Sequence, residues 1–355
     1  MSGIHQFVPM LHRRDAVGRH ALRLRDLLVA QGIDSRIFVE ILDPETASEC
    51  EPASAYEARR EPGDVLVYQL ATASALAGWL SSRSETLVVN YHNITPPEFF
   101  APWDNPLARN QVQARHELQM LAPRTALAVA VSSYNERELH EVGYRNTTVI
   151  PPAALLPEPA EPFPRTPAPS TPPPEGARWL TVGRLAPNKV LEHALMALLV
   201  TRTHYDRGTT LDIIGKTVVP AYSGALRRFS ADLGLHDAVT FAGRMDDDAV
   251  EHAMASSDVM VVTSEHEGFG VTVIEALRRG LPVVANRAGA LPEVLGEAGV
   301  LVNAAEPYEV AAAVADLLAD PKRQGSLAEA GRVRISRLGL DTAGERFVDQ
   351  VRALL

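Results

Sequence analysis

The sequence has one cysteine, no excess of positive charge and no long apolar run. The single cysteine, Cys50, excludes an internal disulfide framework and fits a reducing compartment. No CxxC motif or Cys/His cluster offers a zinc site. The formal net charge of −10 argues against nucleic-acid binding, which needs clustered positive charge.

Membrane and export signals are also missing. No apolar run approaches the roughly 20 residues of a membrane span. The N-terminus, MSGIHQFVPMLHRRDA, lacks the basic and then apolar order of a secretory signal, so we expect a soluble cytoplasmic protein. One short stretch is basic, and we interpret its arginines as a solvated helix face. These arginines are Arg13, Arg14, Arg19, Arg23 and Arg25.

What the chain does have is a repeated alternation of short β-branched runs and helical segments. The 355 residues suit two domains of roughly 150 residues each. The runs IHQFV, SRIFVE, DVLVYQ, TLVVNYH, ALAVAV and TTVI lie in the first half, and RWLTVG, TLDIIG, VTFAG, DVMVV, PVVAN and GVLVN in the second. Buried strands alternating with helices predict an α/β protein with two doubly wound, Rossmann-like parallel sheets.

A proline-rich stretch marks the predicted domain boundary. Proline this dense over residues 151–176 favours an extended, semi-rigid linker. We therefore expect an N-terminal domain over 1–150 and a C-terminal domain over 177–340. Residues 341–355, DTAGERFVDQVRALL, predict a capped amphipathic helix that packs on another element.

Three loops of the second half follow predicted strands and carry the candidate site. Parallel sheets bind ligands at the carboxyl ends of their strands, so these loops should meet at one edge. GRLAPNK places Gly183, Arg184 and Lys189 before a helix, where two cations and a helix N-terminus suit a diphosphate. SEHEGFGVTVIE places Glu267 on a loop and Glu275 on the helix that follows. The third loop is RAGALPEV.

Each of these loops also has an ordinary structural interpretation. A Gly-Arg turn with an exposed lysine is typical of a solvated loop. Glu275, considered without the other loops, is interpreted as a residue on a helix surface. Carboxylates accept hydrogen bonds from adjacent sugar hydroxyls, so two of them beside a helix N-terminus suit a ribose and a hexose flanking a diphosphate. The convergence of three loops favours a binding site.

An acidic triplet, Asp246-Asp247-Asp248, is open to a metal-binding interpretation. Because it precedes the helical stretch AVEHAMASSD, we interpret it as a helix cap instead. We predict that no divalent metal or other cofactor is required, since Arg184, Lys189 and helix dipoles can neutralise a diphosphate.

At these motifs the chain resembles the retaining nucleotide-sugar glycosyltransferases of family 4, part of glycosyltransferase group 1, which have the GT-B fold of two Rossmann-like domains facing a cleft. The resemblance covers nearly the whole chain and is strongest from Trp179 to Asn303. Its most specific element is Glu267-GFGVTVI-Glu275, a carboxylate pair separated by seven residues. GRLAPNK and AGALPEV match two further elements, with Ala290 where the family has a second glycine.

The resemblance implies roles for residues of the second half. It assigns Gly183, Arg184 and Lys189 to the donor diphosphate, with Arg184, Lys189 and Glu267 among the catalytic residues. It assigns Glu267 to the hexose hydroxyls and Glu275 to the ribose hydroxyls. The backbone around Phe269, Gly270 and Val271 would contact sugar and phosphate, and Gly243 and Arg244 fall where the family holds the base.

In the first half the resemblance is less sharp. Gly18 lies where a glycine lets backbone N–H groups approach the diphosphate, although the usual Gly-Gly pair is missing. His92 lies at the tip of the TLVVNY strand, where related enzymes carry a histidine beside the transferred sugar. A lone histidine at a strand end is commonly structural. The stretch from Ile94 to Trp103 either lines the acceptor side or packs.

The resemblance implies transfer of a hexose from a UDP- or GDP-sugar to an acceptor hydroxyl of a glycan, glycolipid or metabolite, with retained anomeric configuration. Some family members act at membrane surfaces, which leaves peripheral contact with the inner membrane face open. Two alternatives remain: a nucleotide-sugar epimerase, and a non-catalytic protein that binds nucleotide sugars. Neither the base, the sugar nor the acceptor follows from the sequence.

Overall fold

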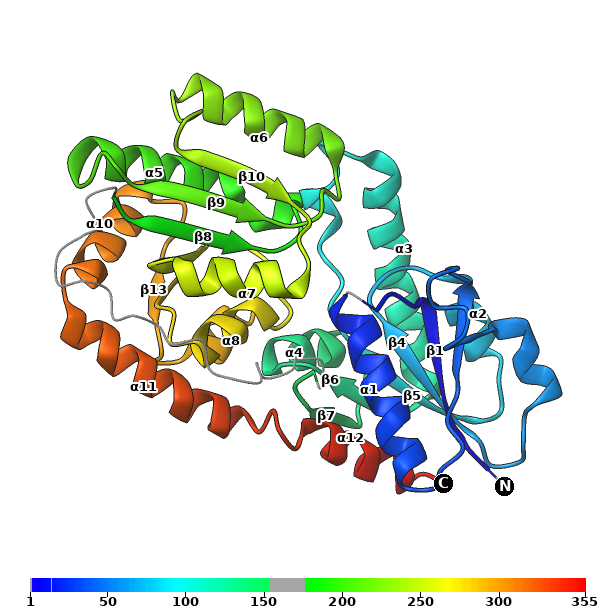
Figure 1. Cartoon of the computed structure of the whole chain (residues 1–355). Coiled ribbons are helices and arrows are strands. Elements are labelled where there is room, and N and C mark those ends of the chain that lie inside the picture. Colours follow the sequence, from blue (N-terminus) through cyan, green and yellow to red (C-terminus); the bar gives the residue numbers. More distant parts are fainter. Residues whose placement is uncertain (1, 14, 153–175) are drawn as a thin grey trace. The chain divides into compact units, whose positions relative to one another are not determined.

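The computed structural model describes residues 2–13, 15–152 and 176–355, and they group into two compact units (Figure 1). The first unit takes the described residues of Met1–Glu98, Asn105–Leu155 and Gly339–Leu355, and the second takes those of Phe99–Asp104 and Leu156–Leu338. The predicted linker over 151–176 lies almost wholly outside the described residues and stays a prediction.

The first unit is built on a seven-stranded sheet in the order β3-β2-β1-β4-β5-β6-β7, and all neighbouring strands are parallel. The strands are β1 (Ile4–Met10), β2 (Ile37–Ile41), β3 (Glu51–Pro52), β4 (Val65–Leu70), β5 (Thr86–Tyr91), β6 (Thr125–Ala130) and β7 (Thr147–Val149). Every residue of β4 is buried, as a strand covered on both faces requires. The order of the strands reverses between β1 and β4, where doubly wound sheets bind ligands.

The helices of the first unit cover this sheet. They are α1 (Ala16–Ala30), α2 (Ala75–Ser81), α3 (Asn105–Leu121), α4 (Ser133–Glu141) and α12 (Ala343–Arg352), with the short 3₁₀ helices η1 (Ala53–Ala58), η2 (Pro97–Phe99) and η3 (Ala122–Arg124). Helix α12, from the far end of the chain, lies beside α1 (Figure 1). Phe347 and Val351 of α12 share a buried cluster with Leu24 and Leu28 of α1. The C-terminal residues therefore complete the core of the first unit.

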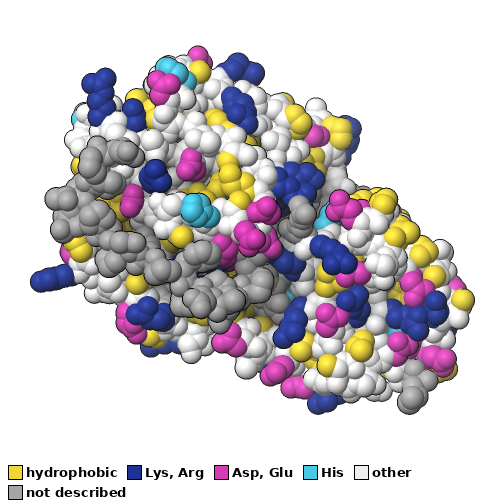
Figure 2. Space-filling model, viewed as in Figure 1, with side chains coloured by type: hydrophobic (Ala, Val, Ile, Leu, Met, Phe, Trp, Pro, Cys, Tyr) yellow, Lys and Arg dark blue, Asp and Glu magenta, His cyan; other side chains and the backbone are white. Residues whose placement is uncertain are grey.

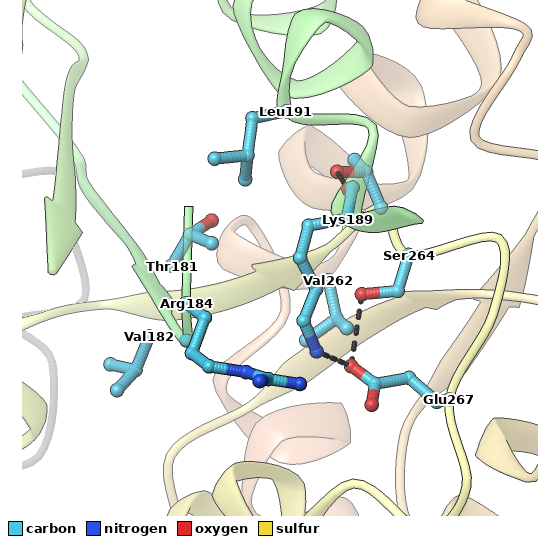
Figure 3. Close-up of a pocket in the computed structure, with 10 residues that line it drawn as sticks. Thr181, Val182, Arg184, Lys189, Leu191, Val262, Ser264 and Glu267 are labelled. Carbon is cyan, nitrogen blue, oxygen red and sulfur yellow. Dashed lines mark hydrogen bonds and ion pairs between the residues drawn. The ribbon is translucent and has the colours of Figure 1, made fainter. Parts of the chain in front are cut away.

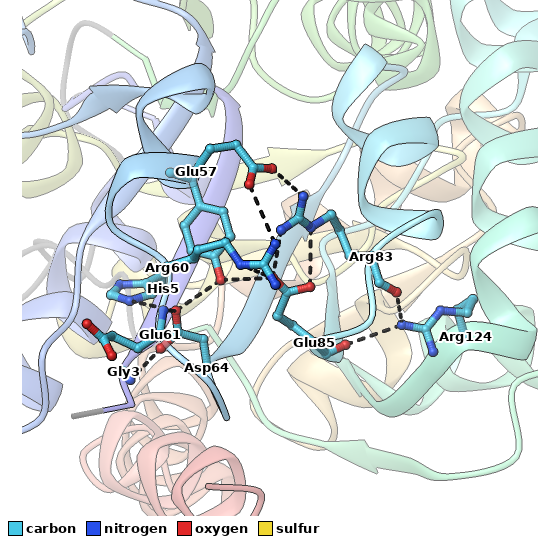
Figure 4. A network of polar contacts seen from close by, with 10 residues as sticks. Gly3, His5, Glu57, Arg60, Glu61, Asp64, Arg83, Glu85 and Arg124 are labelled. Carbon is cyan, nitrogen blue, oxygen red and sulfur yellow. Dashed lines mark hydrogen bonds and ion pairs between the residues drawn. The ribbon is translucent and has the colours of Figure 1, made fainter.

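A polar network lies at the amino ends of β4, β5 and β6, away from the edge where ligands bind (Figure 4). Asp64, just before β4, accepts from the Gly3 amide at 2.8 Å and from the Tyr56 hydroxyl at 3.0 Å. Glu85, just before β5, pairs with Arg83 at 2.7 Å. Burial raises the pKa of Tyr56, so its hydroxyl stays protonated and donates. The network ties the starts of the strands together and therefore has a structural role.

The second unit has a six-stranded parallel sheet in the order β10-β9-β8-β11-β12-β13. Its strands are β8 (Arg178–Val182), β9 (Thr210–Ile214), β10 (Val239–Gly243), β11 (Val259–Val262), β12 (Val283–Asn286) and β13 (Val300–Val302). Its helices are η4 (Pro187–Lys189), α5 (Leu191–His204), α6 (Pro220–Asp232), α7 (Asp247–Ser256), α8 (Val271–Arg278), α9 (Leu291–Leu295), α10 (Pro307–Leu318) and α11 (Pro321–Leu338). The order reverses between β8 and β11.

One short segment from the first half of the chain, Phe99–Asp104, groups with the second unit. The Trp103 ring meets the Tyr222 ring edge-on at 5.3 Å, and the Phe99 ring lies 6.3 Å from that of His266. These contacts show that Phe99 and Trp103 pack against the rest of the second unit.

The predicted α/β class and the two parallel sheets are confirmed, and each predicted strand is present. The capped C-terminal helix is confirmed as a helix, but its capping prediction was wrong. The N-cap residue Thr342 makes no capping hydrogen bond to α12, and its hydroxyl donates instead to the Gly339 carbonyl at 3.4 Å.

Two surface properties bear on the partners. On the face drawn in Figure 2, basic and acidic side chains are interspersed rather than segregated. Among the described helices, none combines the length and the apolar character needed to cross a membrane.

Candidate functional site

A pocket lies at the carboxyl edge of the second sheet, between the loops that follow β8 and β11 (Figure 3). Because the strand order reverses between these two strands, this is the place where doubly wound sheets bind ligands. The pocket is lined by Thr181, Val182, Gly183, Arg184, Lys189, Leu191, Val262, Thr263, Ser264 and Glu267. Four of the residues predicted from the sequence, Gly183, Arg184, Lys189 and Glu267, thus lie together.

An ion pair joins the two loops at the centre of the pocket. The Lys189 ammonium contacts Glu267 Oε1, and the side chains are only 18% and 15% exposed. Ser264 donates to the same carboxylate oxygen at 3.0 Å, while the exposed Arg184 side chain extends toward the pair (Figure 3). The pocket therefore brings two cations and one carboxylate together.

The backbone of Glu267 is held by the third predicted loop, which follows β12. The Ala290 amide donates to the Glu267 carbonyl at 2.9 Å. A Cβ on Gly289, whose φ is +57°, would lie 2.6 Å from that carbonyl oxygen. The preceding Asn286 donates to the Ser264 carbonyl at 3.1 Å. This loop needs glycine at 289 because the backbones meet there, and it fixes the direction of the Glu267 side chain.

The residue after Lys189 is strained. Val190 has φ +44° and ψ +51°, a left-handed conformation that a β-branched residue rarely adopts. Hydrogen bonds on both sides hold it there: Thr263 donates to the Lys189 carbonyl at 2.9 Å, and the Leu191 amide donates to the Tyr222 hydroxyl at 2.9 Å. The strained turn aims Lys189 into the pocket before α5 begins. The sequence carried no signal for it, because Val190 is a poor residue for this conformation.

Glu275 lies in the second turn of α8 and is 3% exposed. The interpretation of this residue as part of a helix surface was therefore wrong. The helix starts at Val271, directly after Gly270, whose φ of +91° turns the chain out of the loop. Phe269 is buried at 6% exposure and anchors that loop. Roles for Phe269, Gly270, Val271 and Glu275 in ligand binding stay predictions.

The predicted base-binding residues lie at the end of β10. Gly243 has φ +73° and open space around it, and Arg244 is exposed. Their role stays a prediction. The acidic triplet beside them is a helix cap, as predicted, because Asp246 accepts from the Ala249 amide at 2.8 Å and begins α7.

The two predicted residues of the first unit have different surroundings. A Cβ on Gly18 would lie 1.8 Å from the His12 carbonyl oxygen, so the close start of α1 requires glycine there. A role for Gly18 beside a diphosphate stays a prediction. His92 follows β5, is partly exposed, and bonds through Nε2 to Gln69 Oε1 at 2.7 Å. Burial of the imidazole lowers the pKa of His92 to about 4, so the ring is neutral near pH 7.

Comparison with known proteins follows the same division of the chain. Residues 163–334 match the family model "Glycosyl transferases group 1". The second unit belongs to this family. The match spans the two loops that line the pocket and the third loop that holds Glu267, which makes the pocket part of a group 1 glycosyl transferase domain.

Curated relatives match about half of the chain. An MMP α-(1→4)-mannosyltransferase from Mycolicibacterium hassiacum is 35% identical over 42% of this chain and 36% of its own length. A D-inositol 3-phosphate glycosyltransferase from Acidothermus cellulolyticus is 33% identical over 51% of this chain and 42% of its own length. A GDP-mannose-dependent α-(1-6)-phosphatidylinositol monomannoside mannosyltransferase from Mycolicibacterium smegmatis is 33% identical over 42% of this chain and 41% of its own length. The matches thus span less than half of each relative.

Solved structures resemble the whole chain. HepE from Anabaena, solved in complex with UDP and glucose, has a TM-score of 0.77 at 18% identity and covers 99% of this chain and 100% of its own. Sucrose-phosphate synthase from Thermosynechococcus elongatus has a TM-score of 0.76 at 20% identity, with coverage of 100% and 99%. At these identities the likeness shows the fold, which is GT-B.

Proposed function

We propose that this protein is a retaining hexosyltransferase that moves a hexose from a UDP- or GDP-sugar to an acceptor hydroxyl. The observation that carries the proposal is the Lys189–Glu267 pair with Arg184 beside it, at the switch point of a group 1 glycosyl transferase domain. Lys189 and Arg184 can bind the diphosphate as charged donors, and Glu267 can accept from hexose hydroxyls.

The donor class is supported by proteins that resemble this one. HepE was solved with UDP-glucose, and two relatives are named as mannosyltransferases, one of them GDP-mannose-dependent. The assignment of Glu275 to the ribose and of Gly243 and Arg244 to the base belongs to the same proposal. Domain closure would exclude water from the reacting sugar.

In the proposed reaction the bond between the anomeric carbon and the diphosphate oxygen breaks while the acceptor oxygen bonds to the same face of that carbon. The acceptor proton passes to the departing diphosphate. Lys189 and Arg184 stabilise the charge that develops on the leaving group, so positioning and electrostatics supply the catalysis. We propose that no divalent metal takes part, and turnover abolished by EDTA and restored by Mg²⁺ would contradict this.

The first experiment is a thermal-shift screen with UDP, GDP, ADP and dTDP and their sugar conjugates, without added metal. A nucleotide at about a hundred times its dissociation constant adds about 2.7 kcal/mol of stability, a shift of a few degrees. The stabilising sugar conjugate is then incubated alone and with candidate acceptors. Transfer with retained configuration supports the proposal. A new sugar nucleotide from donor alone indicates an epimerase, and binding without any product indicates a non-catalytic protein.

A further inference from the structure

A buried network of amide and imidazole side chains lies in the first unit, on the neighbouring strands β1, β4 and β5 and on helix α1; Figure 1 shows where these elements lie. Four of its members are at most 1% exposed and the fifth, His92, is partly exposed. The members are Gln6 of β1, His20 of α1, Gln69 of β4, Asn90 of β5 and His92. None of them lines the Lys189 pocket.

The directions of the hydrogen bonds of 2.7–2.8 Å in this network follow from one end, whereas the longer contact of 3.4 Å between Asn90 Nδ2 and His92 Nε2 brings two donors together and is not counted among them. Gln6 Nε2 lies 2.8 Å from the Ala21 carbonyl oxygen, which only accepts, so the amide of Gln6 must donate there. Gln6 Oε1 therefore faces Gln69, whose Nε2 donates to it at 2.7 Å. As a result Gln69 Oε1, an acceptor, is the atom presented to Asn90 and His92.

This polarity sets the proton positions on both histidines. His92 Nε2 lies 2.7 Å from Gln69 Oε1 and must carry a proton, which leaves Nδ1 as the acceptor of the neutral ring. Asn90 Nδ2 donates to Gln69 Oε1 at 2.8 Å and to His20 Nε2 at 2.8 Å, so His20 must carry its proton on Nδ1. The two histidines therefore hold opposite tautomers.

The surroundings keep both rings neutral. His20 is the titratable group that faces His92, with the rings edge-to-face and 5.2 Å apart, and Phe347 of α12 faces His20 from another side at 5.8 Å. Burial lowers the pKa of His20 well below 6.5, and a charge on His92 would lower it further. Charging one ring would place a cation in this buried site, and charging both rings would bring two cations together.

We propose that Gln69 is a positioning residue that holds His92 as the Nε2–H tautomer, so that Nδ1 can accept a hydrogen bond from a substrate hydroxyl. Gln6 and Asn90 act behind it by fixing which way the Gln69 amide points. The inference rests on the proposed function for its substrate, but the tautomer itself does not. A histidine held in this way accepts a hydrogen bond from the substrate hydroxyl and does not donate a proton to it.

The tautomers are measured by ¹⁵N NMR of the histidine rings in the full chain at pH 7, with assignment by His92→Asn and His20→Asn. We expect a protonated Nε2 and an unprotonated Nδ1 for His92, and the reverse for His20. His92 with its proton on Nδ1, or charged at this pH, would overturn the inference without any variant of Gln69 having to fold.

The role of Gln69 is tested with Gln69→Leu, which removes the acceptor at similar size. We expect both tautomers of His92 to appear and kcat for transfer to fall about 10–100-fold, as misplacement of a substrate-contacting group does, with a much smaller change in the KM for donor. Gln69→Glu keeps an acceptor for Nε2–H and raises the pKa of His92. In that variant kcat should recover at high pH and fall as the pH drops through the raised pKa.

The matched control is Gln111→Leu. Gln111 is a buried amide of α3 in the same unit, and it donates to Asn110, which is not part of the network around Gln69. We expect it to leave the His92 tautomer and kcat unchanged. If Gln69→Leu also leaves both unchanged, Gln69 is not a positioning residue. If the tautomers are as inferred and Gln69→Leu scrambles them in a protein without turnover on any donor, the network stands and the proposed function fails.

Discussion

Lys189→Ala tests the centre of the proposed donor site. In the structure Lys189 contacts Glu267 and is 18% exposed, so its ammonium lies at the pocket rather than in bulk solvent. The substitution removes one charged donor to the diphosphate. It also leaves Glu267 with Ser264 as its remaining side-chain partner at 3.0 Å, and an unneutralised carboxylate then repels a diphosphate.

The magnitude follows from these two effects. A hydrogen bond to a charged group contributes about 1.5–3 kcal/mol, and about 1.4 kcal/mol corresponds to a factor of ten in affinity. We therefore expect the dissociation constant of the preferred nucleoside diphosphate to rise about 10–150-fold. The uncovered charge of Glu267 favours the upper part of this range, since limited exposure reduces screening by salt.

The assay is isothermal titration calorimetry with the preferred nucleoside diphosphate, at 0.15 M salt and without metal. Lys322→Ala is the matched control, because it removes the same charge from an exposed position at the start of α11. The control should bind like the parent protein. A change of less than about twofold for Lys189→Ala would remove this residue from the diphosphate site and refute the reasoning.

Three further outcomes are expected. The Glu267→Gln variant should bind free nucleoside diphosphate a few-fold more tightly, because the Glu267 carboxylate no longer competes with the diphosphate for Lys189, a competition of about 0.5–1 kcal/mol. The same variant should transfer sugar at least about tenfold more slowly. Calorimetry measures the first effect and a turnover assay the second. Gly18→Ala should lower the free energy of unfolding, measured by urea titration, by more than about 2 kcal/mol, because the new Cβ would lie 1.8 Å from a carbonyl oxygen. The control Gly78→Ala in α2, where a Cβ would have nothing within 4 Å, should raise the free energy of unfolding by about 0.5–1 kcal/mol. The free energy of unfolding should fall between pH 7 and pH 5, because His20 and His92 bind protons near their ordinary pKa of 6.5 in the unfolded chain but stay neutral in the folded protein. The dependence of this free energy on pH, measured by urea titration, should be weaker in His92→Asn. An unchanged dependence would contradict the lowered pKa values.

The parallel strands were predictable because each is a short β-branched run bounded by turn residues. β3 was not, because two residues, Glu51 and Pro52, show no period and pair only with their neighbour β2. The docking of Phe99–Asp104 on the second unit was equally hidden, since it depends on the contact of Trp103 with Tyr222 rather than on local sequence.

At the site, the charged residues could be predicted and their supports could not. Lys189 and Glu267 follow predicted strands and carry charges that suit a sugar nucleotide, so both could be proposed from the sequence. The strained Val190 and the hydroxyl of Ser264 were missed, because one is an unfavourable residue for its conformation and the other is chemically ordinary. The burial of Glu275 was missed because a helical carboxylate is usually exposed.

Because α12 packs on the first unit, it determines where the chain can be divided for domain exchange. A chimera that exchanges everything after residue 176 with a relative would replace Phe347 and Val351, and the foreign helix would have to fit Leu24 and Leu28 of the resident α1. Under the proposed function, an exchange of donor specificity should therefore transplant residues 177–338 as an insert and keep Gly339–Leu355 with its own N-terminal half. In the engineering of such enzymes, the transferable module is an internal segment of the chain.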